Sequence, residues 1–240
     1  MLLKKDDVYT LSSLANFKNL VVEISTKKFG DQRLRDNQTK FFKYLDIDGS
    51  KVIKPRQIHS GAVRTVSLED VARKVEKCDG FVTAEKDLYL MILVADCLPI
   101  VAFDPKKRIV GLAHAGWRGT KAKIAENLVG TLLKLGSRPK DILVGFGPVI
   151  EFCHYEVRSD VASAFTKSGF GKSVMRSLSG SIHLDLKQAN VDQLIDFGII
   201  KPNIDVTIKS CTYENPDFFS YRRDGTDSRI AVLIGLRNGG

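Results

Sequence analysis

Three short apolar runs between residues 88 and 113 constrain this chain most. Each is far shorter than the roughly 20 apolar residues of a membrane helix, and each ends at a polar turn, which is typical of buried β-strands. The first run ends at Asp96 and Cys97, and the third leads into His114. Strands that end in reactive side chains, followed by a glycine-containing turn into a helix, form the usual site geometry of α/β proteins.

The rest of the pattern predicts strands and helices along the whole chain. Short runs rich in β-branched residues predict strands at 20–25, 52–53, 81–83, 142–146, 204–208 and 230–236. Apolar residues at helical spacing predict helices at 37–45, 68–76, 120–135, 159–167 and 186–197. With 240 residues, 43% of them hydrophobic, the chain can bury a substantial core. Because no repeat or linker divides it, we predict one α/β domain, residues 1–240, built as a mixed sheet or a two-sheet sandwich with helices outside.

Cys97 and His114 form a candidate metal site together with His59, which lies at a predicted junction between a strand and a loop. One thiolate and two imidazoles suit a catalytic zinc ion, which takes three protein ligands and keeps one position open. Taken singly, each residue has a common structural role, because buried cysteines and core histidines are frequent. The spacing is not a compact signature such as Cys-x-x-Cys, so spacing alone leaves the metal a hypothesis.

Asp79, Cys153 and His154 are further candidates with two interpretations each. Asp79 precedes Gly80, so it is either the polar residue of a turn or a carboxylate that faces the site. Cys153 and His154 could supply a fourth metal ligand or a nucleophile pair, and we expect one of the two to have a structural role. Neighbouring residues on an extended chain point in opposite directions, so we expect only one of the two to face a given site.

A series of motifs links these residues to a known family. They occur in the order Gln57-Ile58-His59-Ser60, Cys78-Asp79-Gly80, Ala95-Asp96-Cys97-Leu98-Pro99, Ala113-His114-Ala115-Gly116-Trp117-Arg118-Gly119, Gly147-Pro148 with Cys153-His154-Tyr155-Glu156, and Cys211-Thr212 with Phe219-Ser220-Tyr221-Arg222-Arg223-Asp224. From about His59 to the last predicted strand, the chain resembles the YfiH family of laccase-domain proteins, which are described as purine nucleoside phosphorylases. This resemblance implies the YfiH-type fold, which is similar to that of cysteine-dependent toxin deamidases.

The same resemblance implies a role for each matching residue. It implies a zinc ion held by His59, Cys97 and His114. Catalytic roles are implied for these three residues and for Asp79 and Arg118, and contacts with substrate for Gln57, Cys153, Tyr155 and Arg222. Two segments depart from the family pattern. Asn37-Gln38 stands where the family has Asn-Arg after a longer glycine- and serine-rich loop, and Asp227-Ser228-Arg229 lacks the usual glycine before its arginine.

Three enzyme classes remain open. The leading hypothesis is a zinc-dependent purine nucleoside phosphorylase that acts with phosphate on adenosine, inosine and methylthioadenosine-type nucleosides. In this enzyme Arg118 and the metal would orient the phosphate. The resemblance also implies adenosine deaminase activity. The alternative is a metal-free thiol hydrolase of peptidoglycan precursor editing, with Cys97 as nucleophile and His114 or His59 as base. A copper-dependent polyphenol oxidase is weaker, because four histidines are too few for an imidazole-rich multicopper cluster. A binding protein without turnover is the non-enzymatic alternative.

The net charge of +9 favours anionic ligands. The basic residues are scattered in short groups such as Lys27-Lys28, Lys106-Lys107-Arg108 and Arg222-Arg223 and form no long stripe. We therefore expect a phosphate-bearing small substrate and no specific nucleic-acid partner. Because the first residues lack an apolar signal core, we expect a cytoplasmic protein that does not associate with membranes, with free cysteines, present as a monomer or weak homodimer.

Overall fold

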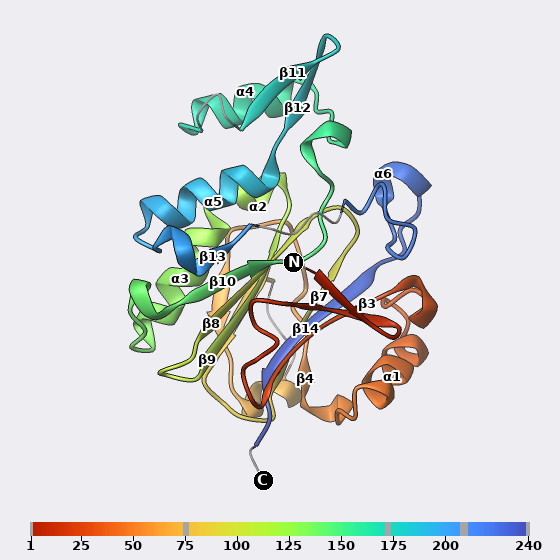
Figure 1. The fold of residues 1–240 in the computed structure, drawn as a ribbon, viewed down its shortest axis with the longest axis vertical. Helices are drawn as coiled ribbons and strands as arrows, with labels where there is room; N and C mark the ends of the chain where they lie inside the picture. The colour runs from red at the N-terminus through yellow and green to blue at the C-terminus, as the bar shows by residue number, and fades with distance from the viewer. Residues whose placement is uncertain (1, 74–76, 171–173, 207–210, 239–240) are drawn as a thin grey trace.

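Two six-stranded sheets form the centre of the molecule. The computed structural model describes residues 2–73, 77–170, 174–206 and 211–238 (Figure 1). The first sheet has the order β1 (Leu2–Lys5), β2 (Val8–Leu11), β3 (Leu20–Ser25), β14 (Ile230–Leu236), β7 (Tyr89–Val94) and β4 (Val52–Ile53). The second has the order β13 (Ile204–Asp205), β10 (Leu143–Phe146), β8 (Leu98–Asp104), β9 (Ile109–Ala115), β6 (Gly80–Thr83) and β5 (Val63–Thr65).

Both sheets are mixed. Their central pairs are antiparallel, whereas β4 pairs in parallel with β7, β5 with β6, and β13 with β10. Strands β7 and β14 of the first sheet pack against β9 of the second, so the main core lies between the sheets. The predicted α/β class and the two-sheet sandwich are thereby confirmed.

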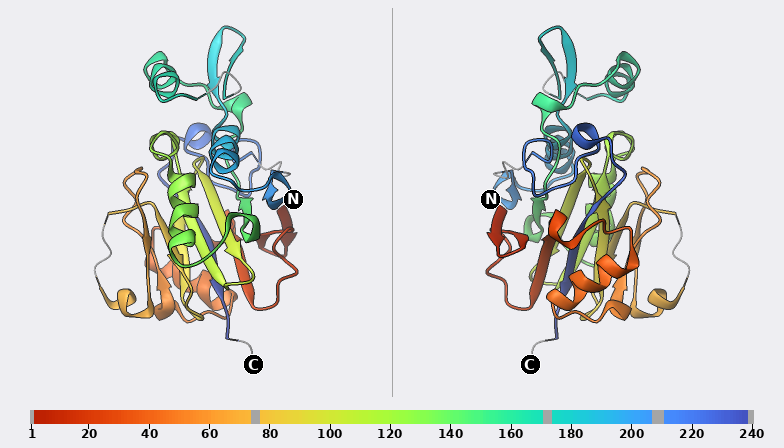
Figure 2. Two further views of the ribbon diagram at one scale, coloured as in Figure 1. Left: turned by 90° about the vertical axis from the view of Figure 1, so that its left-hand side faces the viewer. Right: turned by 90° about the vertical axis from the view of Figure 1, so that its right-hand side faces the viewer.

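Strand β14 shows why its sequence is an unbroken apolar run. Val232 and Ile234 pack into the core between the sheets, while Ala231 and Leu233 point to the opposite side. There they meet Phe41 of α1 (Arg35–Tyr44), which covers the outer face of the first sheet (Figure 2). Because successive side chains of a strand alternate between faces, a strand buried on both sides must be apolar at every position.

The predicted helix 120–135 is wrong as one helix. It is divided into α2 (Trp117–Lys121) and α3 (Ile124–Lys134), because Lys123 adopts a left-handed backbone conformation with φ 61°. Helix α3 packs on the outer face of the second sheet, and both α2 and α3 contact α5 (Leu186–Asp196). Helix α2, which precedes the break, contacts β9.

The predicted helix 159–167 is confirmed, whereas the described part of the predicted helix 68–76 contains only a 3-10 turn, Leu68–Ala72. Helices α4 (Ser159–Lys167) and α6 (Tyr221–Asp224) and the hairpin β11 (Met175–Leu178) with β12 (Ser181–Leu184) complete the regular helices and strands, and α4 and this hairpin project from the sheets (Figure 1). The 3-10 turns are η1 (Lys27–Phe29), η2 (Gly49–Lys51), η3 (Leu68–Ala72), η4 (Pro139–Asp141), η5 (Phe152–His154) and η6 (Lys201–Asn203). Residues 74–76 and 207–210, the ends of a predicted helix and a predicted strand, lie outside the described residues.

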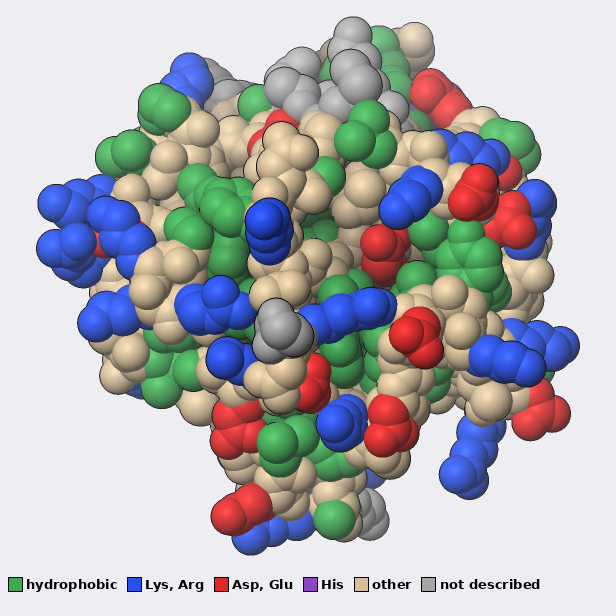
Figure 3. All heavy atoms as spheres, turned by 60° about the horizontal axis from the view of Figure 1, so that its bottom comes forward, with side chains coloured by type: hydrophobic (Ala, Val, Ile, Leu, Met, Phe, Trp, Pro, Cys, Tyr) green, Lys and Arg blue, Asp and Glu red, His purple; other side chains and the backbone are tan. Residues whose placement is uncertain are grey.

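Among the described residues, the charged side chains on the face drawn in Figure 3 form no single stripe. Lys and Arg side chains are spread over this face among Asp and Glu side chains. Within the described residues, every helix is too short or too polar to cross a lipid bilayer.

Candidate metal centre and active site

Three candidate metal ligands that are far apart in the sequence meet at one point. His59 lies in the loop after β4, Cys97 lies between β7 and β8, and His114 belongs to β9. Their donor atoms all lie within 4.8 Å of one another, and the two imidazole rings meet edge to face with centroids 4.8 Å apart. The chain reaches this point through left-handed backbone at His59 (φ 59°) and Asp96 (φ 82°), a conformation that His and Asp adopt more readily than most residues.

Asp79 is fully buried and supports the backbone of His59 and the imidazole of His114. One carboxylate oxygen accepts the N–H of His59 at 2.9 Å and lies 3.0 Å from His114 Nδ1. The other accepts the N–H and the hydroxyl of Ser60 at 2.6 and 2.7 Å. Burial acts to raise the pKa of this carboxyl, but the hydrogen bonds from His114 and Ser60 outweigh it and lower the pKa to about 2. The ionised carboxylate can only accept, so Nδ1 of His114 carries a proton and Nε2 is left for a metal ion.

Gly116 lets the chain pass close to two of the candidate ligands. A Cβ at this position would lie 2.9 Å from Cys97 Sγ and 3.1 Å from His59 Cδ2. Side-chain atoms do not approach this closely without displacement, so a larger residue would push the thiol or the imidazole aside. The close packing of the Cys97 thiol and the His59 ring against the backbone therefore favours a glycine here.

Cys97 and His114 stabilise the charged forms of each other. Burial opposes both charges, but the imidazolium lowers the pKa of the Cys97 thiol, and the thiolate together with Asp79 raises the pKa of His114. A thiol with a lowered pKa is a good metal ligand and a good nucleophile. One thiolate and two imidazoles, with a carboxylate fixing one ring, form the donor arrangement that zinc prefers, so the residues present fit a metal ion.

The three candidate ligands line a cavity of about 490 Å³. Small-molecule sites usually have volumes of about 300–1,000 Å³. The lining contains the arginines Arg33, Arg118, Arg222 and Arg229 and a single carboxylate, Asp96. Asp96 already accepts hydrogen bonds from Thr212 Oγ1 at 2.5 Å and from the N–H of Arg222 at 2.7 Å. The cavity wall is therefore positively charged and suits an anionic ligand.

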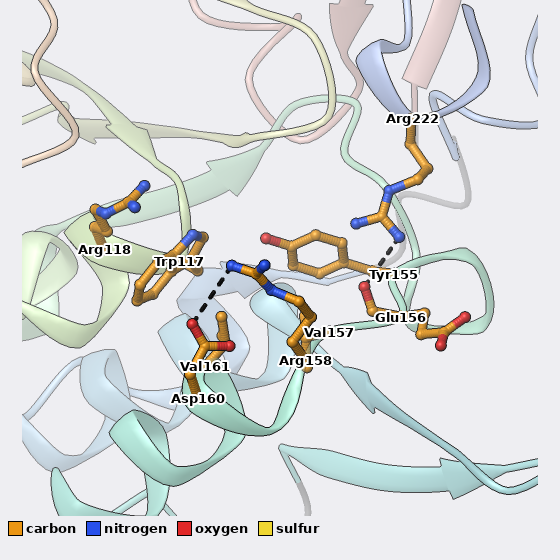
Figure 4. A pocket seen from close by; sticks show the side chains of 9 residues that line it. All are labelled: Trp117, Arg118, Tyr155, Glu156, Val157, Arg158, Asp160, Val161 and Arg222. Atoms are coloured by element: carbon orange, nitrogen blue, oxygen red, sulfur yellow. Dashed lines mark hydrogen bonds and ion pairs between the residues drawn. The ribbon is translucent and has the colours of Figure 1, made fainter. Parts of the chain in front are cut away.

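The predicted residues Gln57, Arg118, Tyr155 and Arg222 also line this cavity. Tyr155 lies between Trp117 and Arg222 at the border with a second cavity of about 530 Å³ (Figure 4). The Arg118 guanidinium stacks on the Trp117 ring, 4.3 Å from its centroid, and that of Arg222 lies 5.4 Å from the Tyr155 centroid. The Gln57 side chain is already engaged with the backbone. Its Nε2 donates to the Leu93 carbonyl and its Oε1 accepts the Leu93 N–H, both at 2.9 Å, so Gln57 joins the His59 loop to β7.

Two other predicted residues, Asp79 and Cys153, are not among those that line the cavity. Cys153 belongs to η5, and burial, the nearby Cys211 and Glu214 raise the pKa of its thiol. The expectation that only one of Cys153 and His154 faces a given site is wrong. It assumed an extended chain, whereas a 3-10 turn brings the donor atoms of both within 4.8 Å of a Glu214 carboxylate oxygen.

Three polar residues of the cavity wall, Arg33, Tyr221 and Arg229, were not predicted as site residues, although Tyr221 belongs to a family motif and Arg229 to a segment compared with the family pattern. Asp31 positions two of them, because its carboxylate pairs with the Arg33 guanidinium at 2.8 Å and accepts the N–H of Arg229 at 3.0 Å. The side chain of Asn37 in α1 donates to the carbonyl of Asp31 at 2.9 Å and fixes this loop. The excess of positive charge was the one available signal, and it does not say which arginines gather.

Comparisons with known proteins place the chain in a family. A family model described as multi-copper polyphenol oxidoreductase laccase matches residues 15–237. A purine nucleoside phosphorylase of Deinococcus radiodurans is 39% identical over 159 residues, which cover 66% of this chain and 61% of that protein. The adenosine deaminase RL5 of an unknown prokaryotic organism is 32% identical over 211 residues, which cover 83% of this chain and 80% of that protein.

Solved structures share the fold along nearly the whole chain. YlmD of Geobacillus stearothermophilus matches with a TM-score of 0.89 at 29% identity and covers 99% of both chains. A Bacillus licheniformis protein solved as hypothetical protein YfiH matches with a TM-score of 0.87 at 26% identity and covers 98% of both chains. The motifs, the fold and the family model agree, and the chain therefore belongs to the laccase-domain family that includes YfiH and YlmD.

Proposed function

We propose that this chain is a zinc-dependent purine nucleoside phosphorylase. The observation that carries the proposal is the meeting of His59, Cys97 and His114 at the wall of a cavity lined with arginines. A metal ion there would supply Lewis-acid polarisation of an oxygen ligand. Relatives named purine nucleoside phosphorylase, among them YlmD of Geobacillus stearothermophilus at 33% identity over 87% of this chain, support the choice of substrate.

Phosphate needs cations that hold it in line with the ribose carbon. Arg118 and Arg222 lie on the same cavity wall as the candidate ligands and present planar guanidinium groups, which pair well with phosphate oxygens. A phosphate oxygen forms a bond to C1′ of the ribose while the bond from C1′ to the purine nitrogen breaks. The electron pair stays with the purine, which takes up the proton released by hydrogen phosphate, and ribose 1-phosphate is the second product.

The purine needs an apolar surface with a polar contact at its edge. Tyr155 and Trp117 offer aromatic faces on the cavity wall. Burial, and then the negative charge of Cys97, raise the pKa of the Tyr155 phenol, so its hydroxyl stays protonated and can donate to a ring nitrogen. A purine nucleoside placed against these rings would direct its ribose toward the arginines and the metal.

Deamination of adenosine is the second reaction of the proposed site, supported by the relative named adenosine deaminase. There a water molecule adds to C6 of the purine and ammonia leaves, giving inosine without consuming phosphate. The two reactions differ in their need for phosphate. Incubating zinc-loaded protein with adenosine should yield adenine and ribose 1-phosphate when phosphate is present, and inosine with ammonia whether or not it is present.

Cys97→Ser tests the centre in the same assay. Serine has nearly the size of cysteine but is a poor zinc ligand, so the variant should keep the fold, lose the metal and lose turnover. Metal content by elemental analysis and product formation by chromatography are the two measurements. Metal-replete protein of the natural sequence that forms neither adenine nor inosine would contradict the proposal.

A thiol hydrolase is the competing function, because Cys97, His114 and Asp79 also stand in the order of a nucleophile, a base and a carboxylate that orients the base. Iodoacetamide distinguishes the two. A zinc site protects Cys97 from alkylation until a chelator is added. A hydrolase nucleophile reacts equally fast with and without zinc, and a trapped acyl-thioester on Cys97 would favour it.

A further inference from the structure

A second group of metal-binding side chains lies outside the cavity. Cys153, His154 and Glu214 bring a sulfur, an imidazole nitrogen and a carboxylate oxygen within 4.8 Å of one another. None of the three is among the residues that line the cavity of His59 and Cys97. This second cluster, Cys153 with His154 and Glu214, is therefore separate from the candidate metal centre.

The backbone brings the three side chains together by two fixed segments. Cys153 and His154 lie on the 3-10 turn η5, whose N–H groups at His154 and Tyr155 bond back to Glu151 and Phe152 at 3.0 and 3.1 Å. The other segment is the loop that carries Glu214. A short parallel bridge between Val149 and Cys211 holds it beside the chain leading into η5. The cluster is thus supported by backbone hydrogen bonds on both sides.

The imidazole of His154 is already oriented toward the carboxylate. Its ring stacks on Tyr213 with a centroid distance of 4.4 Å and an interplanar angle of 14°. Its Nε2 lies 2.8 Å from Glu214 Oε1. A ring held at one face and one edge loses little rotational freedom when it binds an ion, which favours binding.

The cluster can be reached from solvent. The His154 side chain is 30% exposed and that of Glu214 is 63% exposed. An ion entering between them would replace the proton shared by the imidazole and the carboxylate and would take the proton from the Cys153 thiol, because metal ligands bind in their deprotonated forms.

We propose that Cys153, His154 and Glu214 form a second site for a divalent transition-metal ion of the zinc type. Sulfur with nitrogen selects against calcium and magnesium, which prefer oxygen ligands. Three protein ligands leave a position for water, and the exposed carboxylate makes this site weaker than a closed structural zinc site. The ion would join η5, which directly precedes Tyr155 of the cavity wall, to the loop 211–218.

Cobalt titration of the full chain tests the proposal, because a Cys ligand gives Co²⁺ a sulfur charge-transfer absorption. After removal of bound metal with a chelator, the natural protein should take up two equivalents with this absorption. Cys153→Ser should take up one, and Cys97→Ser should keep the one that Cys153→Ser loses. Glu214→Gln should weaken the second equivalent at least about tenfold, the smallest loss expected when even a supporting residue of a metal site is removed.

Glu151→Gln is the matched control. It removes a neighbouring carboxylate that pairs with Lys187 at 2.6 Å, and both equivalents should persist. Because the Glu214 side chain is mostly exposed, Glu214→Gln should fold normally and tests the site even if Cys153→Ser misfolds. The proposal fails if the natural protein binds one equivalent that Cys97→Ser abolishes. It fails equally if the second equivalent survives both Cys153→Ser and Glu214→Gln. Metal uptake is the readout, so the result does not depend on the proposed phosphorylase activity.

Discussion

Asp79 supports two of the candidate metal ligands, although its carboxylate does not line the cavity. It fixes the turn of His59 through backbone N–H groups and the ring of His114 through Nδ1. In the proposed site Asp79 is therefore a positioning residue. The family resemblance implied a catalytic carboxylate, and the geometry gives it a supporting place behind both ligands.

Asp79→Asn should weaken metal binding and lower stability. An amide has one acceptor oxygen where the carboxylate has two, so some of the donors at His59, Ser60 and His114 lose their partner. We expect metal affinity to fall about 10–100-fold, as for other residues that orient metal ligands. The free energy of unfolding should fall by about 1–3 kcal/mol. Metal titration and denaturant unfolding measure the two effects.

Asp70→Asn is the control for this variant. Asp70 also accepts an N–H and a hydroxyl from one serine, Ser67, but at the start of η3. It should cost about 0.5–2 kcal/mol of stability, as expected for a lost cap, and leave metal affinity unchanged. Equal metal loss in both variants would show that Asp79 acts through general stability alone.

Gly116→Ala should displace two candidate ligands without changing their chemistry. The added Cβ would lie 2.9 Å from Cys97 Sγ and 3.1 Å from His59 Cδ2, so one of them must move. We expect loss of metal with the fold retained, measured by elemental analysis and circular dichroism. Gly130→Ala in α3 is the contrast, because its Cβ would meet Phe197 at an ordinary 3.5 Å. That change should raise stability by about 0.5–1 kcal/mol and leave the metal in place.

Residue types and strand ends were enough to select His59, Cys97 and His114 as side chains that should meet. They could not define the support behind them. An Asp-Gly pair predicts a turn as readily as a buried carboxylate, and the choice depends on the register of β6 against β9, which sets Asp79 beside His114. That register is set by the folded sheet and cannot be predicted from the local sequence alone.

At the level of elements, local patterns failed where tertiary contacts fix the backbone. The apolar spacing from 120 to 135 is continuous, yet the helix breaks at Lys123. Buried Asn190 and Gln193 of α5 bond to the hydroxyl and carbonyl of Thr120 at 3.0 and 2.8 Å and so hold the end of α2. Cys153 and His154 similarly lie in a 3-10 turn that no helix or strand pattern in the sequence predicts. In both cases a distant segment determines the local conformation.

Arg223 supports a loop through several hydrogen bonds, as Asp79 supports the loop of His59. Its Nη1 donates to the carbonyls of Thr212 and Tyr213 at 2.8 and 2.9 Å, and its Nη2 donates to that of Phe218 at 2.7 Å. One side chain therefore shapes the loop of residues 211–220 that leads into α6. This loop carries Glu214 of the second cluster and ends next to the arginine-lined cavity.

Arg223→Lys should loosen this loop. A lysine keeps the charge but carries a single ammonium group, which cannot reach several separated carbonyls at once. We expect a loss of about 1–3 kcal/mol in the free energy of unfolding and faster proteolysis within the loop. Arg138→Lys is the control, because its side chain is 60% exposed and pairs with Asp141 at the surface. It should change stability by less than about 0.5 kcal/mol; an equal loss in both would refute the bracing role of Arg223.

At the scale of the whole molecule, the long buried strands were predictable, whereas the short strands β1, β2, β5, β11 and β12 and the strand order were not. Long apolar runs such as that of β14 predict buried strands from the sequence alone. The position of β14 between β3 and β7 depends on pairing across most of the chain. Strands β1 and β2 at the sheet edge are short and partly exposed, so they carry a weak pattern and were not predicted.

Two carboxyl groups with opposite pKa shifts should make opposite contributions to the pH dependence of stability. Asp79 has a pKa lowered to about 2, so the unfolded chain binds more protons and stability rises with pH from about 2 to about 4. Glu23 of β3 is largely buried, and burial raises its pKa to about 7 against the opposing charges of Lys5 and Arg237. The folded chain then binds more protons, so stability falls as pH rises from about 4.5 to about 7.

Glu23→Gln should remove the fall in stability between about pH 4.5 and about pH 7 and should raise stability at neutral pH. The Glu23 Oε2 atom is buried without a hydrogen-bond partner among the described residues, so its ionisation is poorly compensated. Denaturant unfolding of metal-free protein across pH 3–8 should show the variant gaining about 1–3 kcal/mol over the natural chain at pH 8, with the difference vanishing near pH 4. Asp79→Asn should flatten only the acid limb. A constant difference between Glu23→Gln and the natural chain at all pH values would mean that Glu23 is not ionising in this range, because a titrating group must give a difference that changes with pH.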